Sequence, residues 1–449
     1  RDALEIEWDE SAAETRGSSE LVSQYRHLAE GPGALVAERG EAEAALAGAA
    51  KVLEAEYVFP YLAHAPMETQ DFVVQLEQGR CRAWAGSQLQ TVDQAVLAHA
   101  VGLTPAQVEL ETLLAGGSFG RRATPVGDIA GEAGAVAKAV GGTRPVKLMW
   151  TREDDIRGGY FRPLYVHRLR AGLDEAGKIV AWHHRIVGQS VLAGTPFEAA
   201  LVQNGIDSSS VEGARGLPYA IPNFLVDLHS PKVGVPVLWW RSVGHTHNGY
   251  STETFFDQLA RAAGRDPYEM RRELLAEHPR HRAVLDLAAE KAGWGKPLAE
   301  GRARGIAVHE SFSSFVAQVA EISLDGKGFP KVEKVVCAVD CGIALNPDVV
   351  TAQMEGGIGY GLNAALFGEV EVIEGRVKPS NFHDYRPLRI HEMPAVEVHI
   401  VPSTENPTGV GEPGVPPIGP AVANAYLALT GKAIHRLPFS RAFAEETHS

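Results

Sequence analysis

The sequence predicts an α+β protein with two domains, whose boundary lies near residues 276–305. Residues 108–150 predict a strand, a glycine-rich turn, a helix and a second strand, whereas residues 315–377 predict successive β-hairpins. A chain of 449 residues has room for two or three domains of ordinary size. Because 45% of the residues are hydrophobic, the chain can bury large cores, and a disordered chain is excluded.

The composition also excludes several classes of function. With 42 Lys and Arg against 56 Asp and Glu, the formal charge is −14, which argues against non-specific binding of nucleic acid. No apolar run reaches the roughly 18 residues that a membrane span needs. The only cysteines are Cys81, Cys337 and Cys341, so the chain by itself holds neither a disulfide framework nor a cysteine-ligated iron–sulfur cluster.

The first 40 residues predict little regular structure. Residues Arg1 to Trp8 resemble the later part of a strand, and the sequence has no initiator Met. We therefore expect Arg1 to mark a processing boundary and the chain to be one part of a larger protein. Residues 10–33 are polar and rich in Gly, Ser and Glu, which predicts a linker. Residues 42–53 predict a short alanine-rich helix.

The later elements follow from periodicity and turn residues. Apolar residues alternate over 108–114, recur at helical spacing from Ile129 to Val140, and form a strand again over 145–150. The remaining expected elements are a helix over 255–275 that breaks near 264–267, a polar separator over 278–304, hairpins that turn at 325–328 and 374–375, and a final helix over 418–429 that ends at Gly431.

The segment Gly409–Gly414 fits the dinucleotide pattern G-x-G-x-x-G, but its chemistry does not suit a pyrophosphate. Glu412 places a negative charge in the loop, and the nearby prolines remove backbone donors. Glu412 itself, between Gly and Pro just before an apolar helix, is either a carboxylate that can approach a ligand closely or a surface glutamate in a turn.

Three further features have competing interpretations. The loop Gly116–Gly120 either lets backbone approach a bulky ligand or forms a strained corner, and in both cases Phe119 needs something to pack on. Cys337 and Cys341 are best explained as small core residues. His245 and His247, alternating on a predicted strand, could share a metal, but polar lining is favoured because no third ligand is evident.

In order along the chain, nine blocks resemble the molybdenum-binding subunit of molybdenum hydroxylases, the xanthine oxidase family. Isoquinoline 1-oxidoreductase beta-subunit-like proteins and aldehyde dehydrogenase molybdenum subunits are the most similar kinds. The resemblance spans about residues 40–440. The blocks are His64–Glu68, Trp84–Gln88, Gly116–Arg122, Trp150–Asp155, Trp240–His245, Ala338–Gly342 with Asn346-Pro347, Gln353–Gly357, Asn381–Tyr385 and Gly409–Gly414.

The resemblance implies roles for individual residues. Glu412 matches the family's catalytic base, Gln88 the glutamine that hydrogen-bonds an apical oxo group, and Arg241 an active-site arginine that orients substrate or stabilises negative charge. No protein metal ligand is expected, because molybdenum is held through the pterin dithiolene. The implied cofactor-binding residues are Gly116, Gly117, Ser118, Phe119, Gly120, Arg121, Gln353, Gly356, Gly357, Gly409, Val410 and Gly411.

The resemblance also implies an organisation and partners. It predicts a hammerhead-type tail and linker over 1–40, a first molybdopterin-binding domain over 41–280, and over 300–449 the C-terminal part of a second such domain that is incomplete in this chain. We therefore expect a partner chain or upstream fragment that completes the second domain, a 2Fe-2S subunit and a cytochrome c acceptor. The expected cofactor is molybdenum with molybdopterin in the cytosine dinucleotide form.

The expected activity is hydroxylation of an N-heteroaromatic ring, or oxidation of an aldehyde, with water as the oxygen source. Export signals in relatives favour the periplasm, with the cytoplasm as the alternative. Two rival hypotheses remain: a scaffold of the same fold that binds no cofactor, and a nucleotide-dependent dehydrogenase that uses Gly409–Gly414.

Overall fold

The computed structural model describes residues 5–446 and contains three main β-sheets. The largest has the strand order β1-β11-β8-β7-β2, and only the pair β11–β8 is parallel. Most side chains of its central strands are buried on both faces, and the buried side chains include those of His167, His183 and His184. The strands are β1 (Ala34–Arg39), β2 (Lys51–Phe59), β7 (Tyr165–Leu173), β8 (Ile179–Gly188) and β11 (Asn223–His229).

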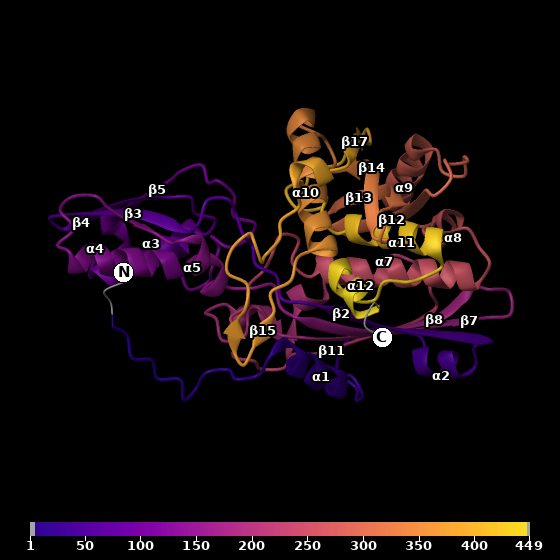
Figure 1. Cartoon of the computed structure of the whole chain (residues 1–449), viewed down its shortest axis with the longest axis horizontal. Helices are drawn as coiled ribbons and strands as arrows, with labels where there is room; N and C mark the ends of the chain where they lie inside the picture. Colours follow the sequence, from indigo (N-terminus) through magenta and orange to yellow (C-terminus); the bar gives the residue numbers. More distant parts are fainter. Residues whose placement is uncertain (1–4, 447–449) are drawn as a thin grey trace.

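A separate lobe is inserted between β2 and β7, which are neighbours in the largest sheet (Figure 1). Its sheet has the order β5-β4-β3-β6, and its own apolar core lies between this sheet and two helices. The elements of the lobe are β3 (Asp71–Glu77), β4 (Arg80–Ala85), α3 (Gln90–Val101), β5 (Val108–Thr112), α4 (Asp128–Ala139), β6 (Val146–Met149) and α5 (Arg152–Arg157).

The second half of the chain forms a third sheet with the order β12-β13-β14-β17. The long hairpin β13–β14 aligns Phe315 with Asp340 and turns through residues 325–329. The elements are α9 (Pro279–Ala292), β12 (Ala303–Ser311), β13 (Ser314–Leu324), β14 (Pro330–Asp340), α10 (Pro347–Leu366), β17 (Ala395–Ile400) and α11 (Ile418–Thr430).

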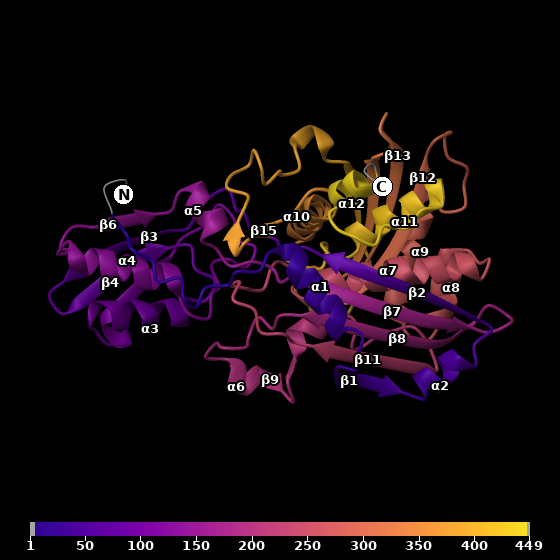
Figure 2. The same ribbon diagram turned by 60° about the horizontal axis from the view of Figure 1, so that its bottom comes forward.

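Helix α7 (His245–Ala262) lies between the largest and the third sheet, with α11 beside it (Figures 1 and 2). Fourteen of its residues are buried, and many of these are polar. Most of their side chains are paired within the protein, as a buried polar group requires, whereas Thr252 Oγ1 has no partner among the residues that the structure describes. Helix α8 (Pro267–Leu274) follows, and Asp266 caps it by accepting from the backbone N–H groups of Tyr268 and Glu269.

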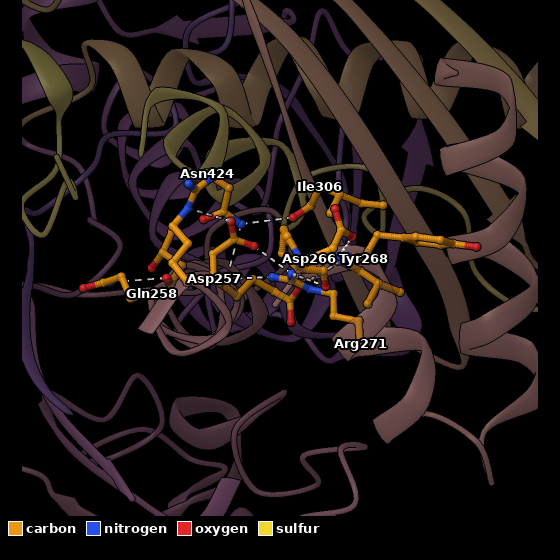
Figure 3. A network of polar contacts seen from close by, with 12 residues as sticks. Asp257, Gln258, Asp266, Tyr268, Arg271, Ile306 and Asn424 are labelled. Atoms are coloured by element: carbon orange, nitrogen blue, oxygen red, sulfur yellow. Dashed lines mark hydrogen bonds and ion pairs between the residues drawn. The ribbon is translucent and has the colours of Figure 1, made fainter. Parts of the chain in front are cut away.

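A buried ion-pair network fixes α7 to α8 and to the third sheet (Figure 3). Arg271 donates to Glu253 Oε2 at 2.9 Å and to Asp257 Oδ1 at 2.7 Å. Asn424, from α11, donates to the carbonyl oxygens of Glu253 and Ile306. The network thus joins elements that lie far apart in the sequence.

Four histidines illustrate how the interior handles titratable groups. Burial lowers the pKa of His64 and His245 to about 4, and that of His184 and His281 to about 3. We call these four the buried histidines. They are neutral at pH 7, which suits imidazole-to-imidazole hydrogen bonds such as that of His184 Nε2 with His167 Nδ1 at 3.0 Å.

The α+β class and most predicted elements are confirmed. The remaining short elements complete the described chain: α1 (Ser18–Leu28), α2 (Ala42–Ala47), α6 (Glu198–Leu201), β9 (Val202–Gln203), β10 (Ile206–Asp207), β15 (Val372–Ile373), β16 (Arg376–Val377), α12 (Phe439–Glu446) and 3-10 turns at Pro105–Gln107, Ser208–Val211 and Ile390–Glu392. The domain ranges 41–280 and 300–449 stay a prediction.

Several local predictions were wrong. Residues 5–8 form no strand, and residues 1–4 of that expected strand lie outside the described part. The expected linker contains α1, because Leu21, Val22 and Tyr25 bury one face of it. The expected helix over 42–53 ends at Ala47, and its last residues begin β2.

The two other corrections concern polar sequence. His245 and His247 begin α7 instead of alternating on a strand, because polar pairing inside the protein hides the helical pattern. The expected separator over 278–304 contains α9, which packs on the third sheet through residues such as Val284 and Leu285.

Candidate active site

The predicted site residues gather where the lobe joins the body of the molecule. They come from five segments: the turn after β4, the loop between β5 and α4, the turn before α7, helix α10, and the loop before α11. Helix α10 lies on the side of the body that faces the lobe (Figures 1 and 2). Hydrogen bonds between these segments connect them into one site.

The glycine loop after β5 has a conformation that ordinary side chains resist. Gly117, Phe119 and Gly120 have φ of 101°, 59° and 109°. A Cβ atom at Gly120 would lie 2.5 Å from the carbonyl oxygen of Trp239, so only glycine lets the two backbones approach this closely. The ring of Phe119 stacks on Tyr360 of α10 with centroids 4.3 Å apart, which answers what this aromatic residue packs on.

Hydrogen bonds hold the Gln88 side chain against the same loop. Its side-chain oxygen accepts a hydrogen bond from the Ser118 hydroxyl and another from the Gly120 N–H at 3.3 Å. Its backbone N–H donates to the carbonyl oxygen of Arg122. Because the amide oxygen is occupied, the NH₂ group is the part of Gln88 that can donate to an oxo group of a ligand.

Arg241 ties three segments together. Its backbone N–H donates to the Phe119 carbonyl oxygen at 3.0 Å, its Nε to the Gly411 carbonyl oxygen at 2.7 Å, and its Nη2 to Gln353 Oε1 at 3.0 Å. Burial lowers the pKa of Arg241, yet an arginine remains charged at neutral pH. A fixed positive charge therefore lies next to the loop that carries Glu412.

Glu412 is held by the turn that follows Arg241. The Ser242 N–H donates to Glu412 Oε1 at 2.8 Å, and the Ser242 hydroxyl donates to the Glu412 carbonyl oxygen at 2.6 Å. Ser242 and Val243 have φ of 75° and 47°, so this turn is strained. The second Oε of the half-buried carboxyl group is left for a ligand or a proton, as a general base requires.

A cavity of about 590 Å³ opens beside these segments. Its walls include the glycine loop, Arg241 and the middle of α10, and its aromatic lining includes Phe119, Trp240 and Tyr360. The rings of Phe119 and Trp240 both stack on the ring of Tyr360, with centroid distances of 4.3 and 4.4 Å. The three rings form an aromatic column. Flat apolar walls, close backbone and the two arginines Arg241 and Arg389 fit a planar, conjugated, anionic group such as a phosphorylated pterin.

Most of the predicted cofactor-binding residues meet at this cavity or at the loops beside it. Gly116, Phe119, Arg241 and Gly356 line the cavity, whereas Gly409 and Gly411 are exposed in the loop before α11. The loop Gly409–Gly414 leads into α11 only at Ile418, after three prolines, so it lacks the arrangement of a dinucleotide site.

Two of the predicted cofactor-binding residues also make contacts that stabilise the fold. The Arg121 side chain is buried, pairs with Asp128 at 2.7 Å, and lies against the rings of Trp150 and Tyr160, so only its backbone remains for a ligand. Gly357 lets α10 pack on the loop before α11, since a Cβ atom there would lie 3.0 Å from Gly414.

The sequence analysis missed Tyr360 and Glu212. Tyr360 lies four residues beyond Gly356, so the two share one face of α10, and that spacing was a usable signal for a residue near the cavity. Glu212 lies in a segment without periodicity and gave no signal. Among the described residues, no group of three or more His, Cys, Asp or Glu side chains is arranged to hold a metal ion.

Comparison with known proteins agrees with this geometry. Residues 27–275 and 249–394 match two models of molybdopterin cofactor-binding domains. Isoquinoline 1-oxidoreductase subunit beta of Brevundimonas diminuta is 34% identical over 391 residues, which cover 86% of this chain and 49% of that protein. The membrane-bound aldehyde dehydrogenase (pyrroloquinoline-quinone) of Gluconacetobacter polyoxogenes is 28% identical over 465 residues, which cover 97% of this chain and 60% of that protein.

A solved structure has the same fold. Quinoline 2-oxidoreductase from Pseudomonas putida 86 superposes with a TM-score of 0.80 at 15% identity, covering 98% of this chain and 82% of that one. The chain spans about half of the length of its relative from Brevundimonas and three fifths of that from Gluconacetobacter. The chain belongs to the molybdopterin-binding proteins of the molybdenum hydroxylase, or xanthine oxidase, family.

Proposed function

We propose that this chain is the catalytic molybdenum subunit of a multi-subunit oxidoreductase. Its reaction is the hydroxylation of an N-heteroaromatic ring, or the oxidation of an aldehyde, with water as the oxygen source. The observation that carries this proposal is the convergence of Glu412, Gln88 and Arg241 beside one cavity in a protein of the molybdopterin-binding family.

The cofactor would be molybdenum with molybdopterin in its cytosine dinucleotide form. The glycine loop, Gly356 and Arg241 would hold it, because they give close backbone, open space and positive charge along one wall of the cavity. When bound, the cofactor supplies the dithiolene ligands of the metal and accepts two electrons from the substrate.

The side chains of this chain would provide the acid–base chemistry. Glu412 takes the proton of the water-derived hydroxyl that attacks an electron-poor carbon, and the Ser242 N–H fixes its direction. The Gln88 amide donates to an oxo group, and Arg241 stabilises negative charge that develops in the transition state.

The overall reaction converts R–H and water into R–OH with release of two protons and two electrons. The electrons would pass to 2Fe-2S clusters on another subunit and then to a cytochrome c. This chain has only three cysteines, all buried and free, and a 2Fe-2S cluster needs four cysteine ligands. A partner chain or fragment would complete the second molybdopterin-binding domain. We place the complex in the periplasm, on the strength of the family resemblance.

Two substrate classes have support from relatives. The name of the Brevundimonas protein favours an N-heteroaromatic ring, and that of the Gluconacetobacter protein favours an aldehyde. The aromatic column of Trp240, Tyr360 and Phe119 fits the cofactor as well as a flat substrate, so it does not decide between them. None of the helices in the described range is long and apolar enough to cross a membrane.

Glu412→Gln tests the proposal in the complex purified with all its partner chains. The expected result is a loss of turnover of about 10²–10⁴-fold with isoquinoline, quinoline or an aldehyde, while molybdenum and pterin content stay at the wild-type level. Glu405→Gln, an exposed position in the same loop, is the matched control and keeps full activity. Retained turnover in Glu412→Gln would refute the proposal, and a protein without molybdenum would favour the cofactor-free scaffold.

A further inference from the structure

The turn before α7 receives two carboxyl groups, and the catalytic proposal uses only one of them. The Ser242 N–H donates to Glu412, and two residues later the Gly244 N–H donates to Glu212 Oε2 at 3.3 Å. Glu212 lies between a 3-10 turn and a loop that are distant from Glu412 in the sequence. The strained turn thus brings a second carboxyl group close to the proposed base.

Glu212 has surroundings that favour its protonated form. Burial raises the pKa of Glu212 to about 8, the Gly244 N–H opposes this, and the nearby carboxylates of Glu412 and Asp207 add to it. Asp207 is itself occupied, because it accepts hydrogen bonds from the hydroxyl groups of Ser190 and Ser209 and from three backbone N–H groups. The other titratable group that faces Glu212 is His245.

A pair of imidazoles continues from Glu212. His245 Nε2 lies 4.0 Å from Glu212 Oε2, and His245 Nδ1 lies 2.9 Å from His309 Nε2. Gly213 makes room for this pair, since a Cβ atom there would lie 2.5 Å from His309 Cε1. Burial lowers the pKa of His309 well below its usual value, as it does for His245, so each ring has one nitrogen that donates and one that accepts.

The pair ends at a second cavity. His245 and His309 line a space of about 200 Å³ together with His281, Glu310 and Glu253. This cavity is distinct in its lining from the larger one, because the two share no residue. A polar cavity of this size has room for several water molecules, which can accept a proton from an imidazole and carry it onward.

We propose that Glu212, His245 and His309 carry a proton from Glu412 to the 200 Å³ cavity in each turnover. The inference rests on the proposed function, in which Glu412 acquires one of the two protons released per substrate. Glu412 gives that proton to Glu212 while Glu212 gives its own to His245 Nε2, and the Nδ1 proton of His245 passes to His309 Nε2. His309 then releases its Nδ1 proton to water. One proton has moved along the relay, both rings now carry their proton on Nε2, and both return to the Nδ1–H tautomer before the next turnover.

The gap of 4.0 Å between Glu212 and His245 is closed by a small side-chain rotation or by one bridging water. The relay leaves Arg241 and the cofactor cavity untouched, which separates proton exit from substrate entry. Glu212 is therefore a positioning residue for the proton and has no contact with the substrate in this scheme.

Glu212→Gln tests the relay in the intact complex, because glutamine keeps the oxygen that accepts from Gly244 but cannot pass on a carboxyl proton. We expect cofactor reduction in a single turnover to stay within about twofold of wild type, since Glu412 starts that turnover unprotonated. We expect steady-state kcat to fall at least tenfold. In wild type kcat falls above about pH 8, where Glu212 has lost its proton, and this inflection is absent from the variant.

Glu369→Gln is the matched control, because burial also raises the pKa of Glu369 while its charged neighbours are Arg436, Arg441, Glu371 and Glu445. It should leave kcat and the pH profile unchanged. As a second variant, His245→Ala should lower steady-state kcat and recover with added imidazole. Wild-type kcat and pH profile in Glu212→Gln would overturn the relay alone, provided Glu412→Gln is inactive. Equal turnover in Glu412→Gln and wild type would overturn the proposed function and the relay together.

Discussion

Arg271→Met isolates the contribution of the buried network that anchors α7. The guanidinium is fully buried and makes three hydrogen bonds of 2.7–2.9 Å, to both carboxylates and to the Glu253 carbonyl oxygen. Methionine fills part of the volume and supplies no donor. Glu253 then loses its charged partner, and Asp257 keeps only the long 4.0 Å contact with the partly exposed Arg261.

Removing one partner of a buried ion pair costs about 3–5 kcal/mol, because the stranded charge pays for desolvation without compensation. Unfolding entropy of about 2.1 cal/mol/K per residue converts this to a decrease in Tm on the order of 3–5 °C for a chain of this size. The network also holds the middle of α7, the helix that follows the turn carrying Arg241 and Ser242, so the variant should lose cofactor faster on heating than wild type does.

Arg272→Met is the matched control on the same helix. Its guanidinium pairs with Asp286 at 3.1 Å, but both side chains are about two-fifths exposed. Water replaces that interaction, so Tm should barely change. Differential scanning calorimetry of both variants in the same buffer decides the matter, and equal Tm values for Arg271→Met and Arg272→Met would refute the reasoning.

Three further outcomes are expected. Gly120→Ala should lower both cofactor content and Tm, because its Cβ would clash with the backbone at a φ of 109°. The control Gly326→Ala, whose Cβ would meet no atom within 4 Å, should change neither quantity. Normal cofactor content in Gly120→Ala would contradict this. Arg241→Lys should lower kcat/KM about tenfold at unchanged Tm, since one ammonium cannot bond both Gly411 and Gln353, and wild-type kcat/KM would count against it. Acid should destabilise the fold, because the buried histidines bind protons near pH 6.5 in the unfolded chain but only near pH 3–4 in the folded chain. Their contribution to the free energy of unfolding is therefore complete above pH 6.5 and falls below it by about 1.4 kcal/mol per pH unit per histidine. A Tm that stays flat between pH 7.5 and 5 would exclude this.

The elements that the sequence predicted well are those with a simple apolar pattern. The hairpin around 325–328, the glycine loop with its following helix, and the final helix ended by Gly431 each bury one face of a regular element. Local periodicity is then enough, because burial and backbone conformation point to the same structure. The packing requirement of Phe119 was predictable for a related reason, since an aromatic side chain among glycines needs a partner.

The failures lie where tertiary contacts override that pattern. The first half of α7 is polar on all sides and buried all the same, so its helical character depends on partners such as Ser210 and His167 that the local sequence does not reveal. Glu212 belongs with these failures, because only the turn at Gly244 gives it a role. The cofactor-binding role of Arg121 stays a prediction, and its side-chain contacts were not predictable, because its position in a motif does not say where a long side chain turns.

The central claim is that this chain holds a molybdenum–pterin cofactor on which Glu412 acts. The most direct test is the content of molybdenum and of pterin in the purified complex, measured beside turnover for wild type and Glu412→Gln. The account predicts about one molybdenum and one pterin per chain in both proteins, with turnover only in wild type. A wild-type complex that turns over without molybdenum, or a Glu412→Gln complex that retains wild-type turnover, would contradict it.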